Sequence, residues 1–232
     1  MGITNVHISA YLADPEAAIL REFANSGGEA DKENLRKVLE GAFDDGKTLD
    51  MLVQHPHAKT ARLERYHVLA LRMYTTQSYG RINNPLRQDP PARPHPFAAT
   101  TYFISEAIKK LRAVAADRPD AHQARTFWRG MKDLGLSAEF FAHGGTEYAP
   151  MSTSASKGVA CDFAVSGCPL VFKYVTPDFM SRGADIAFLS VYEAEAEVLY
   201  PPLTYLRSKG TVTEVIGGHT MLVATVEPFF PS

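Results

Sequence analysis

The stretch SVYEAEAEVLYPP, residues 190–202, is an unusual strand sequence, because three glutamates alternate with small residues before an apolar run. In an extended chain, side chains two apart share a face, so Glu193, Glu195 and Glu197 are expected on one side. Like charges this close repel, which a solvated edge tolerates and a binding or catalytic site can use. A charged edge strand protected against pairing is the simpler interpretation, so the surrounding sequence has to decide.

The composition indicates an ordinary soluble globular protein. Of 232 residues, 45% are hydrophobic and 22% charged, and Lys plus Arg number 24 against 26 for Asp plus Glu. The formal net charge of -2 gives no reason to expect nucleic acid or an anionic membrane as partner. The N-terminus lacks the features of a signal peptide, and no window approaches the roughly 18 apolar residues of a membrane span. We therefore expect a cytoplasmic protein, or a domain excised from a larger one.

No metal is predicted from the cysteine and histidine spacing. Cys161 and Cys168 fit neither a zinc knuckle nor a redox pair, and we expect both to be buried free thiols. His55 and His57 flank a proline, and no HExxH pair occurs.

The order of hydrophobic patterns predicts an α+β fold. Apolar residues recur at three- and four-residue steps over 31–43, 60–75 and 101–117, which is typical of helices. Residues 83–97 contain too many prolines for a regular element and are expected to form a long loop. From residue 125 onward, short apolar or alternating runs separated by Gly, Pro and Ser, one of them over 185–190, predict a mostly antiparallel sheet.

These patterns predict one domain over residues 1–232. Its helical N-terminal lobe would cover 1–120 and its β-rich core 121–232.

Three polar motifs occur in the second half. Arg129 in FWRGM would emerge at the end of a buried strand, and Ser152, Thr153 and Ser154 in MSTSAS precede a short predicted helix that carries Phe163. The third motif is EAEVLYPP. Singly, each has a structural explanation: a salt-bridged arginine, helix N-caps and a charged edge.

In this order the motifs resemble the arginine-serine-glutamate class of mono-ADP-ribosyltransferases, of the arginine-specific type. The resemblance spans roughly residues 127–202, and connecting segments such as GGTEYAPMSTS are similar to the branch found in many microbial eukaryotes. It implies the ADP-ribosyltransferase fold, in which a helical lobe accompanies a split, mostly antiparallel sheet that forms a cleft for NAD.

The resemblance also implies roles for the charged residues. Glu197 would bind the ribose hydroxyl and stabilise the cation-like ribose that forms when nicotinamide leaves. Glu195 would position and help deprotonate the acceptor, and a carboxylate suits both N–H donors of an arginine. Arg129 would bind the pyrophosphate of NAD or the nicotinamide-side ribose. Tyr192 falls where the family places an aromatic that meets the protein substrate, whereas Glu193 has no assigned role.

The remaining implied contacts concern NAD alone. Gly130 would let the backbone approach the ligand, Ser152 would hydrogen-bond the ribose and the second glutamate, and Thr153 and Ser154 would shape the strand that binds the cofactor. Phe163 resembles the aromatic that stacks on nicotinamide. A core position for Phe163 is an alternative, with Phe172 or Tyr174 as the stacking residue.

The expected activity is transfer of ADP-ribose from NAD to an arginine side chain of a protein, with release of nicotinamide. One alternative is an NAD glycohydrolase that uses the same site. Another is a catalytically silent module that binds NAD or a protein. The protein target and the oligomeric state are not predicted.

Overall fold

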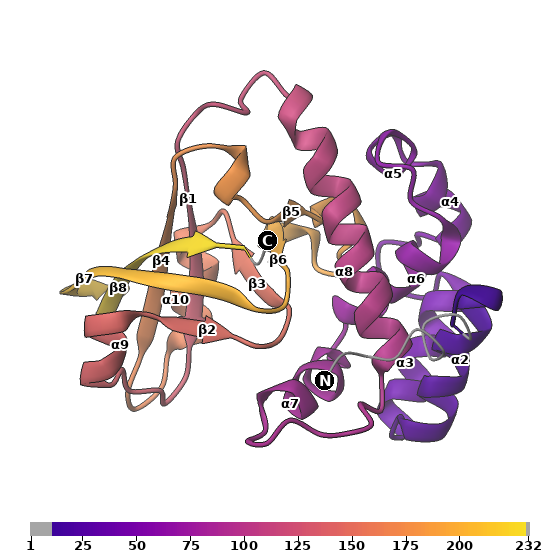
Figure 1. Ribbon diagram of the computed structural model, residues 1–232, viewed down its shortest axis with the longest axis horizontal. Helices are drawn as coiled ribbons and strands as arrows, with labels where there is room; N and C mark the ends of the chain where they lie inside the picture. The colour runs from indigo at the N-terminus through magenta and orange to yellow at the C-terminus, as the bar shows by residue number, and fades with distance from the viewer. Residues whose placement is uncertain (1–10, 231–232) are drawn as a thin grey trace. The chain divides into compact units, whose positions relative to one another are not determined.

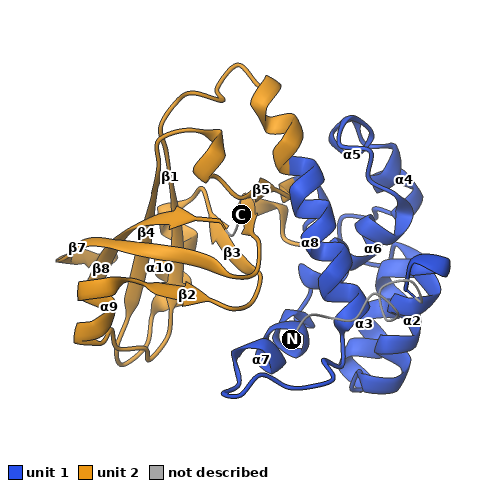
Figure 2. Ribbon diagram, in the orientation of Figure 1, with its two compact units in different colours: residues 1–111, 188–191 blue, residues 112–187, 192–232 orange. Residues whose placement is uncertain are grey.

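Helices come first along the chain and strands follow, as Figure 1 shows for this computed structural model. The structure describes residues 11–230. Two compact units are distinguished in Figure 2: unit 1 contains the residues up to Leu111 together with Phe188–Val191, and unit 2 contains Arg112–Ala187 and the residues from Tyr192 onward.

Unit 1 is built from helices. They are α2 (Pro15–Ser26), α3 (Glu29–Glu40), α4 (Leu49–Gln54), α5 (Pro56–Thr60), α6 (Arg65–Tyr74), α7 (Tyr79–Arg87) and α8 (Ala98–Ala113), whose last two residues belong to unit 2. Helix α6 is buried from His67 to Tyr74, and its residues Val68, Leu71 and Met73 lie in the core. The predicted helices over 31–43, 60–75 and 101–117 are confirmed as α3, α6 and α8.

Helix α7 corrects the prediction of a loop over 83–97. The helix continues to Arg87 with Pro85 inside it, and only the residues after it are irregular. Proline in a helix costs a backbone hydrogen bond, but Ile82 and Asn83 are almost fully buried. Tertiary burial therefore overrides the local sequence preference.

A buried arginine explains why residues 188–191 belong to the helical unit. Arg72 on α6 is 1% exposed, and its Nη1 donates to the carbonyl of Leu189 at 2.8 Å. Its Nη2 contacts both carboxylate oxygens of Asp45 at 2.7 and 2.8 Å, which compensates for burying the charge.

Unit 2 contains an eight-stranded sheet in the order β2-β7-β8-β4-β1-β3-β6-β5. The strands are β1 (Arg125–Met131), β2 (Gly145–Glu147), β3 (Met151–Ser154), β4 (Leu170–Thr176), β5 (Ala184–Asp185), β6 (Glu197–Tyr200), β7 (Thr204–Ile216) and β8 (His219–Phe229). All neighbouring pairs are antiparallel except β4 and β8. The predicted α+β class and mostly antiparallel sheet are confirmed.

Short helical segments complete unit 2. They are the α-helices α9 (Ala138–His143) and α10 (Lys157–Ala164) and the 3-10 turns η1 (Val114–Asp117), η2 (Phe179–Ser181) and η4 (Glu193–Glu195). The 3-10 turn η3 (Ala187–Leu189) lies at the boundary of the two units, where a strand was expected over 185–190.

The two sheet faces bury different clusters. One face carries a large aromatic core that includes Phe127, Phe172, Tyr174 and Tyr200. The other carries a smaller cluster, in which Cys161 and Ala164 of α10 pack on Val171 and Val223. Because side chains alternate along a strand, consecutive side chains of β1, and likewise of β3, lie on opposite faces of the sheet.

Cys161 is buried and free as predicted. Cys168 is also free but exposed, so the prediction that both thiols are buried is wrong for Cys168.

His67 on α6 predicts a pH dependence of stability. Burial lowers the pKa of this side chain from 6.5 to about 4, and Lys110 contributes to the shift. Its Nδ1 accepts the Glu64 N–H at 3.0 Å, while Nε2 is buried with no hydrogen-bond partner among residues 11–230. The unfolded chain binds a proton more readily than the folded one, so the free energy of unfolding should fall as the pH drops from 6.5 towards 4.

The His67→Asn variant keeps an acceptor for the Glu64 N–H and does not titrate. Urea unfolding at several pH values should show a smaller loss of stability below pH 6.5 for this variant than for the wild type. Parallel pH profiles of the two proteins would contradict the assignment.

Candidate functional site

Strands β1 and β3 are bonded to each other over a short distance only. Strand β1 pairs with β4 from Arg125 to Met131, whereas its register with β3 is the single pair of Trp128 and Ser154. Beyond that pair the Arg129 side chain joins the two strands, because Nη1 donates to the Ser152 carbonyl at 2.7 Å. The sheet is therefore split beside Arg129.

Arg129 carries an available positive charge. It is partly buried, and its Nε contacts the Met131 sulfur at 3.2 Å. Within residues 11–230 it forms no ion pair with a carboxylate. A partly desolvated guanidinium whose protein partners are neutral retains donors for an anion.

The serines and the second glutamate share one face of the sheet. Strand β3 pairs with β6 so that Ser152 lies opposite Leu199 and Ser154 opposite Glu197. Directly opposite residues in an antiparallel pair point to the same side, and diagonal neighbours are within reach of each other. Glu197 is 4% exposed, so its carboxylate begins β6 in a desolvated position.

The first two glutamates do not lie on a strand. Glu193 and Glu195 belong to the 3-10 turn η4, and Ala196 follows with left-handed backbone angles of φ 45° and ψ 55°. The expectation that Glu193, Glu195 and Glu197 alternate along one strand is therefore wrong. Alternation in the sequence cannot reveal a left-handed residue at position 196.

The turn presents its side chains differently from β6. Burial raises the pKa of Glu195, whose side chain is partly exposed. Tyr192 immediately precedes the turn and is 47% exposed. The turn can therefore offer a basic carboxylate and an accessible aromatic ring to a second molecule.

Helix α10 fills the space beside the Gly130 Cα. A Cβ at this position would lie 2.0 Å from the Ala160 carbonyl oxygen and 2.8 Å from the Ala164 nitrogen, both in α10. The packing of α10 on β1 thus requires the glycine, whereas the sequence suggested that a ligand does.

Phe163 and Thr153 each have partners of their own. Phe163 on α10 is 52% exposed, and the Lys132 ammonium lies 4.9 Å from its ring centroid. The Thr153 hydroxyl donates to the Val198 carbonyl at 2.8 Å. The alternatives Phe172 and Tyr174 are buried in the aromatic core.

Two residues near the split have contacts that the sequence did not predict. Ser154, not Ser152, bonds to the glutamate turn, through its hydroxyl and the Glu195 carbonyl. Trp128 shares the Ser154 face and has the ammonium groups of Lys157 and Lys173 at 4.9 and 5.7 Å. The N-cap of α10 is Ser156, whereas residues 152–154 form β3.

Arg182 and Asp185 lie close together in the sequence but do not pair with each other. Each has its own partner instead: Arg182 pairs with Asp120 at 3.2 Å and Asp185 with Arg118 at 3.4 Å.

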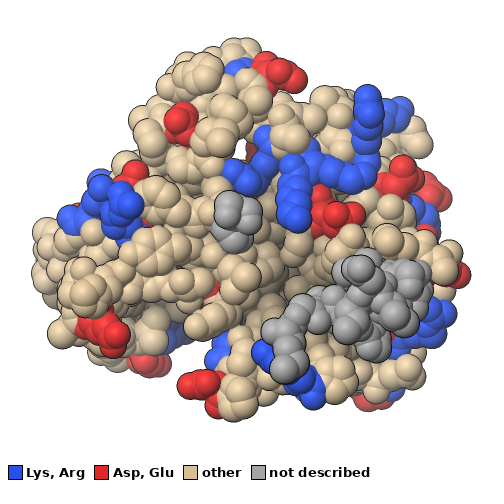
Figure 3. Space-filling model, in the orientation of Figure 1, with Lys and Arg blue, Asp and Glu red and all other residues tan. Residues whose placement is uncertain are grey.

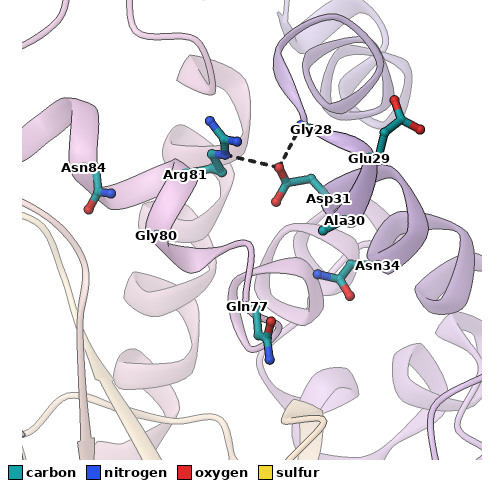
Figure 4. A pocket seen from close by; sticks show the side chains of 9 residues that line it. All are labelled: Gly28, Glu29, Ala30, Asp31, Asn34, Gln77, Gly80, Arg81 and Asn84. Carbon is teal, nitrogen blue, oxygen red and sulfur yellow. Dashed lines mark hydrogen bonds and ion pairs between the residues drawn. The ribbon is translucent and has the colours of Figure 1, made fainter.

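Unit 1 contains a hollow of about 470 Å³ at the N-terminal ends of α3 and α7 (Figure 4). Asp31 in its wall accepts the Gly28 N–H at 2.8 Å and pairs with Arg81 at 3.4 Å. These bonds close the first turn of α3 and occupy the carboxylate. We therefore locate the candidate site in unit 2.

Other site classes have little support in the described chain. Among residues 11–230, no three His, Cys, Asp or Glu side chains are grouped as metal ligands would be. No helix in the same range is both long and apolar enough to cross a membrane. Basic and acidic side chains both appear on the face seen in Figure 3, over a mainly uncharged surface.

A family model described as NAD:arginine ADP-ribosyltransferase matches residues 24–218 of the chain. No curated protein sequence matches it.

Solved structures show the same fold at low sequence identity. The ADP-ribosyltransferase HopU1 of Pseudomonas syringae has a TM-score of 0.58 at 20% identity, covering 86% of this chain and 97% of that one. A mutant of the eucaryotic mono-ADP-ribosyltransferase ART2.2 in complex with NADH has a TM-score of 0.60 at 15% identity, covering 97% and 88%. Exoenzyme S of Pseudomonas aeruginosa, bound to human 14-3-3 protein beta and carba-NAD, has a TM-score of 0.55 at 21% identity. The match covers 84% of this chain and 88% of that one.

The contact between α10 and β1 predicts the effect of adding a methyl group. Gly130→Ala should lower the free energy of unfolding by about 1–3 kcal/mol, because the new Cβ meets backbone atoms that cannot rotate away. Gly135→Ala is the matched control, since its Cβ would have no atom within 4 Å. Urea unfolding checks both variants, and equal losses for the two would contradict the packing account.

Proposed function

The chain belongs to the NAD:arginine ADP-ribosyltransferase family, and from this premise we propose that it transfers ADP-ribose from NAD to an arginine side chain of a protein and releases nicotinamide. The observation that carries the proposal is the occurrence of an arginine and a buried glutamate on the two strands beside the serine strand β3. Arg129, which has no carboxylate partner in residues 11–230, and the 4% exposed Glu197 lie on strands that flank β3.

Arg129 acts on the anionic part of NAD. Its guanidinium supplies the donors for the pyrophosphate or for the nicotinamide-side ribose, at the edge where β1 leaves β3. The bound ligands in the structures of exoenzyme S and ART2.2, carba-NAD and NADH, support NAD as the co-substrate. Gly130, Ser152, Thr153 and Phe163 are further contacts proposed for NAD.

Glu197 acts on the reacting ribose. When the bond from ribose to nicotinamide breaks, positive charge develops on the sugar, and a fixed carboxylate in a desolvated position stabilises it. Ser152 lies diagonally from Glu197 on the same face and is the proposed hydroxyl partner of the ribose and of this carboxylate.

Glu195 acts on the acceptor. A guanidinium nitrogen of the protein substrate forms the new bond to the ribose carbon, nicotinamide departs with the electrons of the old bond, and Glu195 accepts the guanidinium proton. The raised pKa of Glu195 favours this proton transfer. Tyr192, exposed beside the turn, is proposed to contact the protein substrate.

The two glutamates should respond differently to removal of charge. Glu197→Gln should lower both nicotinamide release and transfer to agmatine, an arginine mimic, by roughly 100-fold, because both reactions pass through the same cation. Glu195→Gln should abolish transfer to agmatine and retain hydrolysis of NAD. Nicotinamide release and the yield of ADP-ribosyl-agmatine measure the two reactions, and mild, equal effects would contradict the assignment.

Arg129 should be sensitive even to a conservative change. Arg129→Lys keeps the charge but loses the planar fork, so the KM for NAD should rise about tenfold or more. Arg125→Lys is the control on the same strand, because Arg125 is exposed and pairs with Asp120 at 2.7 Å. Steady-state kinetics with varied NAD should separate the variants; an unchanged KM in Arg129→Lys would exclude Arg129 from NAD binding.

A further inference from the structure

Ser154 links two segments that flank the split. Its side chain is buried, at 6% exposure, and its hydroxyl donates to the Glu195 carbonyl. The same oxygen accepts the Ser156 N–H at 2.9 Å, at the N-cap of α10. One hydroxyl thus connects the glutamate turn to the helix that packs on β1.

Backbone hydrogen bonds also hold the glutamate turn. Within it, the Glu195 N–H donates to the Tyr192 carbonyl at 3.0 Å and the Ala196 N–H to the Glu193 carbonyl at 3.1 Å. Ala196 adopts a left-handed conformation that non-glycine residues rarely hold unaided. Just after β3, the Ala155 N–H donates to the Ala196 carbonyl at 3.2 Å, and Ser154 adds a side-chain bond to the Glu195 carbonyl.

The two glutamates are held by different bonds. Glu197 begins β6, where backbone pairing with β3 and the Ile186 N–H at 3.0 Å fix it. Glu195 lies one residue before the left-handed Ala196, and its carbonyl depends on Ser154. Removing the Ser154 hydroxyl should therefore displace Glu195 and leave Glu197 in position.

We propose that Ser154 is a positioning residue that holds Glu195 against the acceptor and so sets the ratio of transfer to NAD hydrolysis. This inference rests on the function proposed above, because it assumes that Glu195 receives the acceptor proton. In this proposal Ser154 acts through the Glu195 carbonyl and not through contact with a reacting molecule.

Three variants test the inference. Ser154→Ala removes the hydroxyl, and Ser154→Thr restores one on a β-branched side chain that suits a strand. Thr176→Val is the control for a lost buried hydrogen bond, because the Thr176 hydroxyl donates to the Arg125 carbonyl at 2.8 Å at the far end of β1.

Activity is measured as ADP-ribosyl-agmatine and free ADP-ribose formed from NAD. Ser154→Ala should lower transfer at least about tenfold while hydrolysis changes less than about threefold, with a raised KM for agmatine. Ser154→Thr should recover the wild-type ratio, and Thr176→Val should keep it. An equal fall of both products in Ser154→Ala, or an unchanged ratio, would overturn the inference.

Hydrogen exchange supplies a readout that does not depend on activity. The amides of Glu195 and Ala196 should exchange faster in Ser154→Ala than in the wild type or in Thr176→Val. Unchanged exchange would overturn the positioning role. If the wild-type protein neither hydrolyses NAD nor modifies agmatine, the proposed function fails, and the exchange result still decides whether Ser154 fixes the turn.

Discussion

Beyond the pair of Trp128 and Ser154, the Arg129 guanidinium replaces the backbone ladder between β1 and β3 by donating to the Ser152 carbonyl. The rest of the site depends on this substitution of a side chain for a strand contact. A continuous ladder would bury the backbone edges and leave no opening for a ligand, whereas the split leaves a cationic group at the edge of β1. Strand β6 pairs with the other edge of β3, so only β3 lies between the strand of Arg129 and the strand of Glu197.

Two contacts of α10 fix the positions of the segments around the split. Helix α10 lies so close to β1 that only glycine fits at position 130, and Ser156 at its N-cap donates to Ser154. Ser154 in turn bonds to the turn that carries Glu195. The arginine strand, the serine strand and the glutamate turn are thus joined through backbone atoms and one hydroxyl, which is how residues about 70 positions apart in the sequence act as one site.

Much of the fold was predictable because it follows from hydrophobic periodicity. The apolar stripes of α3, α6 and α8, the buried runs of β1 and β4, and the order of helices before strands all lie in the local sequence. Helix α7 was missed because Pro85 argues against a helix locally, while the burial of Ile82 and Asn83 that sustains it is a tertiary effect. Cys168 was misjudged for a similar reason, since nothing local to it tells a buried thiol from an exposed one.

The candidate site was predictable in its residue types and less so in its geometry. The motifs around Arg129, Ser152 and Glu197 are visible in the sequence, but the separation of Glu195 from Glu197 depends on the left-handed Ala196. That conformation rests on bonds from Ala155 and Ser154, some 40 residues away, which no local pattern encodes. The requirement for Gly130 likewise comes from α10, which lies some 30 residues further along the chain.

The most direct measurement is the reaction of the wild-type protein with NAD, with and without agmatine, followed by nicotinamide release and mass spectrometry. The account predicts release of nicotinamide and formation of ADP-ribosyl-agmatine. Nicotinamide release with no adduct would contradict arginine as the acceptor, and no release at all would contradict the assignment of a working NAD site to the split between β1 and β3.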